Sequence, residues 1–138
     1  MDDILERVPG IRLHRPPPGL THAHHLYTFF VPGGSDVRYQ LVAALDRRGV
    51  EIQLRYFPQY LLPEWRLRGH RMGECPVAER IWFDEQMNLP CHPGLSDDQV
   101  DHLAVALTDA LDEVLRPVRA ATRTQPTTRA AQGAIPCP

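Results

Sequence analysis

The 138-residue chain contains no lysine, and all 15 of its basic residues are arginine. Lysine amines are the groups that form Schiff bases with carbonyl substrates and cofactors. A polypeptide without lysine cannot form such a bond through a side chain. This absence excludes lysine-based covalent catalysis by these 138 residues acting alone.

Cysteine and serine are also scarce. The three cysteines show no C-x-x-C spacing, so they do not indicate a disulfide framework; they are Cys75, Cys91 and Cys137. The two serines, Ser35 and Ser96, each stand where a helix N-cap is expected. Serine-based hydrolysis is therefore not expected, and residues 32–35 lack the spacing and the lysine of a phosphate-binding loop.

The sequence also lacks a hydrophobic run long enough to span a bilayer. The acidic start, Met-Asp-Asp, is unlike a signal peptide, so we expect a cytoplasmic location. The net charge of −2 and a pI near 6.4 give no electrostatic reason to expect binding to nucleic acid or to a membrane surface.

The hydrophobic pattern predicts an α+β fold in a single domain. We expect a small antiparallel or mixed sheet with about three helices packed on one face. The predicted strands are residues 11–13, 25–31, 50–54 and 87–89. The first predicted helix spans residues 2–8, and the second is capped by Ser35 or Asp36 and runs to residue 48. A third predicted helix begins at Pro76, and a fourth begins after Ser96.

The last of these helices has the clearest sequence signals. Ser96 and Gln99 form a capping box, and one apolar stripe follows, made of Val100, Leu103, Ala104, Leu107, Leu111 and Val114. Pro117 is predicted to end the helix. We therefore place the domain at residues 1–116 and predict a disordered tail over residues 117–138, where the apolar periodicity stops.

Histidine and cysteine offer two weak candidates for chemistry. His22 and His24 form an H-x-H pair, but no carboxylate or cysteine lies nearby at metal-ligand spacing, so no metal site is assigned. Cys91 and His92 are neighbours, and on an extended chain neighbours point to opposite faces. They are therefore not assigned as a nucleophile and its base.

The segment from Arg55 to Arg66 interleaves aromatic rings, prolines and arginines. Such a loop can present stacking faces and anion-binding guanidinium groups to a ligand or a partner. It can equally be a loop held over a small core. The residues alone leave both interpretations open.

The order of motifs from Pro9 to Leu115 resembles the C-terminal part of the DegT/DnrJ/StrS family of pyridoxal-phosphate sugar aminotransferases. The resemblance is carried by residues 9–11, 25–28, 48–52, 75–80 (Cys-Pro-Val-Ala-Glu-Arg) and 88–100 (Asn-Leu-Pro-Cys-His-Pro-Gly-Leu-Ser-Asp-Asp-Gln-Val). It implies the small C-terminal domain of a fold type I aminotransferase. It covers about three quarters of this chain but only the last third or so of a family member.

The resemblance also implies a function for the loop. Intact members transfer an amino group, usually from glutamate, to a keto-sugar that is usually nucleotide-linked, and their loop approaches the active site. This suggests substrate binding by Arg55, Tyr56, Gln59 and Tyr60. The family commonly has H-Y-x-P-x-H here, whereas Arg55 and Tyr60 replace the two histidines. No catalytic, cofactor-binding or metal-binding residue is assigned.

The cofactor domain of the family lies upstream of this region and supplies the Schiff-base lysine. We therefore expect this chain to be inactive alone and to hold no cofactor by itself. Pyridoxal phosphate is expected only if a large domain completes the enzyme. The expected partner is a separately encoded large domain or a homologous aminotransferase, and we expect an oligomer that forms through exposed apolar surface. Two alternatives stay open: a non-catalytic binding or regulatory module, and a new activity of the 55–66 loop.

Overall fold

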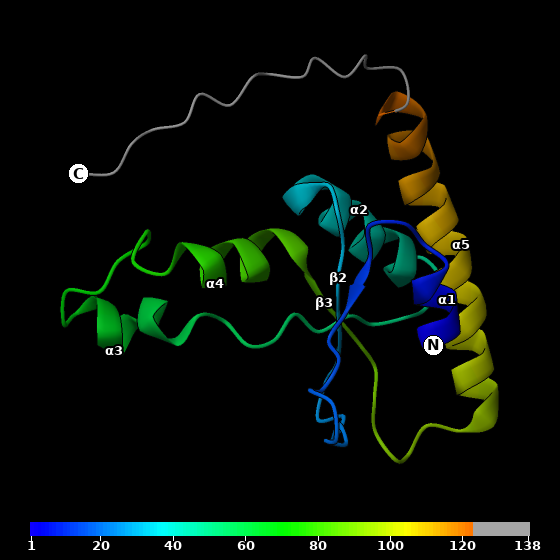
Figure 1. Cartoon of the computed structure of the whole chain (residues 1–138), viewed down its shortest axis with the longest axis horizontal. Helices are drawn as coiled ribbons and strands as arrows, with labels where there is room; N and C mark the ends of the chain where they lie inside the picture. The colour runs from blue at the N-terminus through cyan, green and yellow to red at the C-terminus, as the bar shows by residue number, and fades with distance from the viewer. Residues whose placement is uncertain (123–138) are drawn as a thin grey trace.

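The computed structural model describes residues 1–122. Its centre is a three-stranded antiparallel sheet in the order β1-β2-β3, formed by Arg12–Leu13, Tyr27–Phe30 and Gln86–Leu89 (Figure 1). In the register of β2 and β3, Phe29 pairs with Met87, and both are fully buried. The predicted α+β class and small antiparallel sheet are confirmed.

The helices that form the core with this sheet are α1 (Asp2–Glu6), α2 (Gly34–Asp46) and α5 (Asp97–Thr122). Helix α2 packs against α5. Apolar side chains of these helices and of β2 and β3 share one buried cluster, whose fully buried members include Leu5, Phe29, Leu41, Leu45, Met87 and Leu107. This core fixes the positions of the sheet and of the loops that leave it.

The predicted N-cap of α2 is wrong. The helix begins at Gly34 with Gly33 as its N-cap, and neither Ser35 nor Asp36 caps it. Gly33 has φ 93°, in the left-handed region that glycine adopts without steric cost. Because two glycines allow this turn, the chain enters the helix before it reaches the serine.

Helix α5 starts as the capping box predicts. The Ser96 amide donates to Gln99 Oε1 at 2.9 Å, and the Gln99 amide donates to Ser96 Oγ at 3.3 Å. The helix does not end at Pro117, however, but continues to Thr122. A proline inside a helix removes one backbone hydrogen bond and crowds the carbonyl four residues earlier. In α5 these two effects do not end the helix. Residues 123–138 of the predicted tail lie outside the described residues.

Replacing Ser96 with alanine is expected to lower the free energy of unfolding by about 1 kcal/mol, because the Gln99 amide loses its side-chain acceptor. Urea denaturation measures this change. Substitution of Thr108, whose hydroxyl donates to the Ala104 carbonyl within the same helix, by alanine is the control. An equal loss for both variants would contradict a specific capping role for Ser96.

The strand predicted over residues 50–54 is wrong: the segment has no assigned secondary structure, although the chain runs extended from α2 toward residue 59 (Figure 1). Hydrogen bonds from a side chain of β3, rather than a backbone ladder, join this segment to the sheet. The buried Asn88 donates through Nδ2 to the carbonyls of Gln53 at 3.1 Å and Arg55 at 2.9 Å. The alternating pattern survives: Ile52 and Leu54 are half-buried against the core, while Glu51 and Gln53 are exposed.

Residues 59–80 form an arm that extends away from the sheet, on the side opposite α5 (Figure 1). It contains η1 (Gln59–Leu61), α3 (Pro63–Arg66) and α4 (Pro76–Arg80), and Pro76 occupies the predicted first helical position. Helix α4 continues as a π-helical turn, η2 (Ile81–Glu85), directly into β3.

The fully buried Arg38 of α2 ties the base of this arm to the core. Its Nη1 donates to the carbonyl oxygens of Trp82 and Phe83 in η2. The guanidinium carbon also lies 5.7 Å from the ring centroid of Trp82. Burial lowers the pKa of Arg38, but a guanidinium keeps its charge over the working pH range.

Within residues 1–122, no helix is both long enough and apolar enough to cross a membrane.

Candidate functional site

The four predicted substrate-binding residues lie at the base of the arm, and two of them lie next to the extended segment. Arg55 is exposed, and its carbonyl accepts hydrogen bonds from Gln86 and Asn88 of β3. Tyr56 is 59% exposed and turns toward His25. Its hydroxyl lies 2.8 Å from His25 Nε2, and the two rings are stacked with 6.0 Å between centroids.

The other two residues lie in the first turn of the arm. Gln59 is exposed at the start of η1. Tyr60 is half-buried, and its hydroxyl donates to Glu79 of α4. Partial burial and this hydrogen bond raise the pKa of Tyr60 to about 12. The structure therefore directs Tyr56 and Tyr60 toward different partners, and substrate binding by the four residues stays a prediction.

Glu79, in the Pro-Val-Ala-Glu-Arg motif at the start of α4, accepts hydrogen bonds from three parts of the arm. Besides the Tyr60 hydroxyl, its Oε1 accepts from the amides of Gly73 at 2.7 Å and Cys75 at 3.3 Å. These donors favour the charged carboxylate, and the hydrogen bond from Tyr60 is the main reason that the pKa of Glu79 is lowered. One carboxylate thus holds both ends of the 60–75 loop together.

Acidification is therefore expected to loosen the arm before the core. A carboxyl group with a lowered folded pKa stabilises the fold above its unfolded pKa, about 4.3 for glutamate, and this contribution is lost as the pH falls through the folded value. The amide proton shifts of Gly73 and Cys75, followed by NMR, should titrate below pH about 4.3. Glu74 lies between these two amides, and its pKa is also lowered, chiefly by its hydrogen bond with His70, so the test uses the Glu74→Gln background. There the shifts should still titrate, and they should stay flat once Glu79 is also replaced by glutamine; a transition that persists in the double variant would contradict the assignment.

A hollow of about 270 Å³ opens beside the His25–Tyr56 pair. Its walls come from the start of β2, from the extended segment and from the end of β3. The lining residues are His25, Leu26, Glu51, Gln53, Asn88, Leu89, Pro90, Cys91 and His92. Sequence reasoning missed this group, although the exposed alternating positions of Glu51 and Gln53 were a signal that both side chains share one face.

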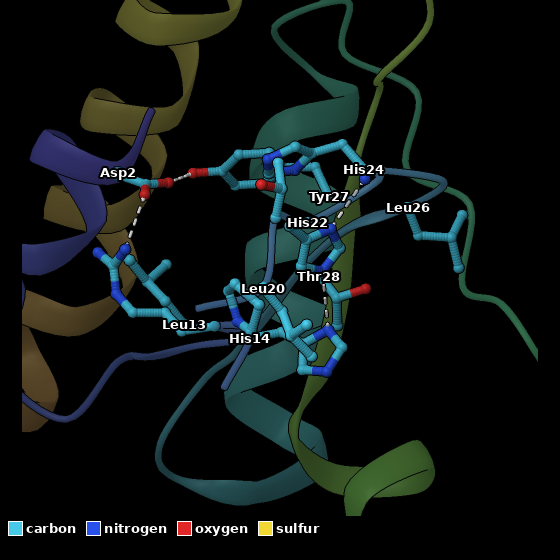
Figure 2. Close-up of a pocket in the computed structure, with 12 residues that line it drawn as sticks. Asp2, Leu13, His14, Leu20, His22, His24, Leu26, Tyr27 and Thr28 are labelled. Carbon is cyan, nitrogen blue, oxygen red and sulfur yellow. Dashed lines mark hydrogen bonds and ion pairs between the residues drawn. The ribbon is translucent and has the colours of Figure 1, made fainter. Parts of the chain in front are cut away.

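A second hollow, of about 310 Å³, lies between α1 and the 14–25 loop and contains three histidines (Figure 2). His22 Nδ1 accepts from the His24 amide at 2.8 Å, and His22 Nε2 lies 3.3 Å from His14 Nδ1. Beside them, the Tyr27 ring stacks on His24 with 5.8 Å between the ring centroids, and the Tyr27 hydroxyl donates to Asp2, whose carboxylate also pairs with Arg15. Burial, followed by the bond to Asp2, raises the pKa of Tyr27.

Two of these histidines, His14 and His22, have their ring lone pairs engaged in hydrogen bonds. Because His22 Nδ1 is an acceptor, neutral His22 carries its proton on Nε2 and donates it to His14. The lone pairs of His14 Nδ1 and His22 Nδ1 are therefore not free to bind a metal ion. Among the described residues, no group of three or more histidine, cysteine or acidic side chains is arranged to hold a metal.

Comparison with known proteins identifies the family to which this fold belongs. The model of the DegT/DnrJ/EryC1/StrS aminotransferase family matches residues 1–108. The chain belongs to this family. The family is dependent on pyridoxal phosphate.

Individual relatives match the same region. The chain is 29% identical over 105 residues to GDP-perosamine synthase of Caulobacter vibrioides, covering 74% of this chain and 28% of that protein. It is 30% identical over 115 residues to dTDP-4-dehydro-2,3,6-trideoxy-D-glucose 4-aminotransferase of Saccharopolyspora spinosa. This match covers 80% of this chain and 27% of that protein. The structure of the aminotransferase TlmJ of Streptoalloteichus hindustanus superposes on this chain with a TM-score of 0.68 and 29% sequence identity. The superposition covers 83% of this chain and 30% of TlmJ.

This family member thus spans less than a third of the length of the relatives it matches. Its residues do not fit the family cofactor by themselves, because the 138 residues offer no lysine amine to bind the aldehyde carbon. No chemical step through pyridoxal phosphate can be assigned to the side chains described above.

Proposed function

We propose that this chain serves as the C-terminal, substrate-facing part of a sugar aminotransferase that transfers an amino group to a nucleotide-linked keto-sugar. In this proposal, amino transfer requires a lysine-bearing large domain from outside these 138 residues, and the chain alone is inactive. One pair of observations carries the proposal: a family match over residues 1–108, and a sequence without lysine.

The arm supports the expected association with a large domain. Several of its apolar side chains are exposed, with Leu67 at 89%, Val77 at 62% and Met72 at 57%. Exposed apolar side chains grouped on one projecting element are typical of an interaction surface. The bonds that Glu79 makes to Tyr60, Gly73 and Cys75 keep this element in one conformation, which lowers the entropic cost of binding.

Affinity purification of the tagged chain from the organism that encodes it tests the association. Mass spectrometry should find a lysine-containing polypeptide of the same family in the eluate. The variant Leu67→Glu should reduce that recovery, because it places a charge among the exposed apolar side chains of the arm. The control variant Leu20→Glu changes an equally apolar, exposed residue of the 14–25 loop and should not reduce it. Recovery of the chain alone would contradict the proposal and favour an independent binding module.

A further inference from the structure

We propose that the hollow lined by Glu51, Gln53 and His92 binds the sugar ring, and that it favours the amino-bearing product over the nucleotide. This inference rests on the proposed function, since the ligand class comes from there. The position and the preference come from the hollow itself. It lies beside Tyr56, the predicted substrate-binding residue, through the 2.8 Å contact of that hydroxyl with His25.

The size and the lining of the hollow suit one sugar ring. At about 270 Å³ it is just below the range of roughly 300–1,000 Å³ typical of sites for larger ligands. Exposed carboxylate, amide and imidazole groups of Glu51, Gln53 and His92 can exchange hydrogen bonds with hydroxyl groups. Leu26, Leu89 and Pro90 supply apolar surface for the C–H face of a ring.

One wall of this hollow is rigid. The Asn88 side chain donates to the carbonyls of Gln53 and Arg55, and its Oδ1 accepts from the Thr28 hydroxyl at 2.9 Å. Asn88 therefore fixes the segment that carries Glu51 and Gln53 against β3 and has little hydrogen-bonding capacity left for a ligand. A wall held in this way needs no ordering when a ligand binds.

The charge of the lining selects among the parts of a nucleotide-linked sugar. None of the nine lining residues is an arginine, while Glu51 contributes a carboxylate. A diphosphate would lack a guanidinium partner here and would be repelled by Glu51. Glu51 Oε1 accepts from Gln53 Nε2 at 3.2 Å, and within the described residues Oε2 has no partner. It can therefore pair with the ammonium group that amino transfer creates on the sugar.

Titration of the full isotope-labelled chain by NMR tests the proposal with three probes: methyl 4-amino-4-deoxy-glucopyranoside, methyl glucopyranoside and dTDP. We expect saturable shift changes at Glu51, Gln53 and His92 with both sugars, with the amino sugar binding about threefold more tightly, the effect of one exposed ion pair. In Glu51→Gln the preference should vanish while glucoside binding persists. Glu64→Gln, an exposed carboxylate on α3 with the same change of charge, should keep the preference.

Three outcomes would overturn the proposal: no saturable change at these residues with either sugar, changes produced by dTDP instead, or an amino-sugar preference that survives Glu51→Gln. Because the titration uses this chain alone, it separates the two proposals. A failure to associate with a large domain would not alter these spectra, and an empty hollow would not prevent association.

Discussion

Replacing Leu107 with alanine is expected to lower the free energy of unfolding by about 2–5 kcal/mol. Leu107 lies on α5 in the buried cluster shared with α2 and the sheet and has no exposed surface. Removal of its side chain creates a cavity in a packed core, where the surrounding atoms relax only partly. The loss is a large fraction of the roughly 5–15 kcal/mol by which a typical folded domain is stable.

Urea denaturation of Leu107→Ala measures this loss, with Val105→Ala as its matched control. Val105 lies on the same helix but is 62% exposed, so its truncation should change the free energy of unfolding by less than about 0.5 kcal/mol. An unchanged m-value would show that the variant alters stability rather than the extent of unfolding. A loss below about 1 kcal/mol for Leu107→Ala, well under the usual range, would contradict the packing of α5 described above.

The isolated chain is expected to transfer no amino group from glutamate to a nucleotide-linked keto-sugar, even when pyridoxal phosphate is added. Enzymes accelerate reactions by about 10⁶-fold or more, and these residues include no lysine that could form a Schiff base with pyridoxal phosphate. Release of 2-oxoglutarate, measured by a coupled assay, should stay at the background of free cofactor. Addition of the large domain recovered with the chain should raise it far above that background.

Two controls are needed to interpret the result of this assay. The Saccharopolyspora spinosa 4-aminotransferase, assayed in parallel with its own substrate, shows that the assay detects turnover. The Leu67→Glu variant shows whether turnover depends on docking of the arm. Turnover by the isolated chain that rises in proportion to its concentration would contradict the proposal and would point to a catalytic group other than lysine.

The sequence predicted the sheet and the long helix well because their signals are local. A run of aromatic and β-branched residues that stops at Pro32 and two glycines indicated β2, and Ser96 with Gln99 indicated the start of α5. The extended segment at residues 50–54 shows the limit of this reasoning. Its alternation was read correctly, but its hydrogen bonds come from Asn88, more than thirty residues away, and no local pattern reports that.

The candidate site was less predictable. Family resemblance pointed to Tyr60, whose hydroxyl is occupied by Glu79, and missed the hollow, which forms only when residues near 25, 51 and 90 meet. Arg38 had a usable signal, since it lies three and seven positions before Leu41 and Leu45 on the buried face of α2. Its role became visible only when Trp82 and Phe83 supplied the carbonyl partners.

Amino transfer that involves this chain is expected to use a lysine that lies outside these 138 residues. The most direct measurement is borohydride reduction of the affinity-purified material, followed by peptide mapping to locate the fixed cofactor. We expect the pyridoxyl group on a lysine peptide that is not part of these 138 residues. Its attachment within this chain, or an eluate with no cofactor and no lysine-bearing family member, would contradict the account.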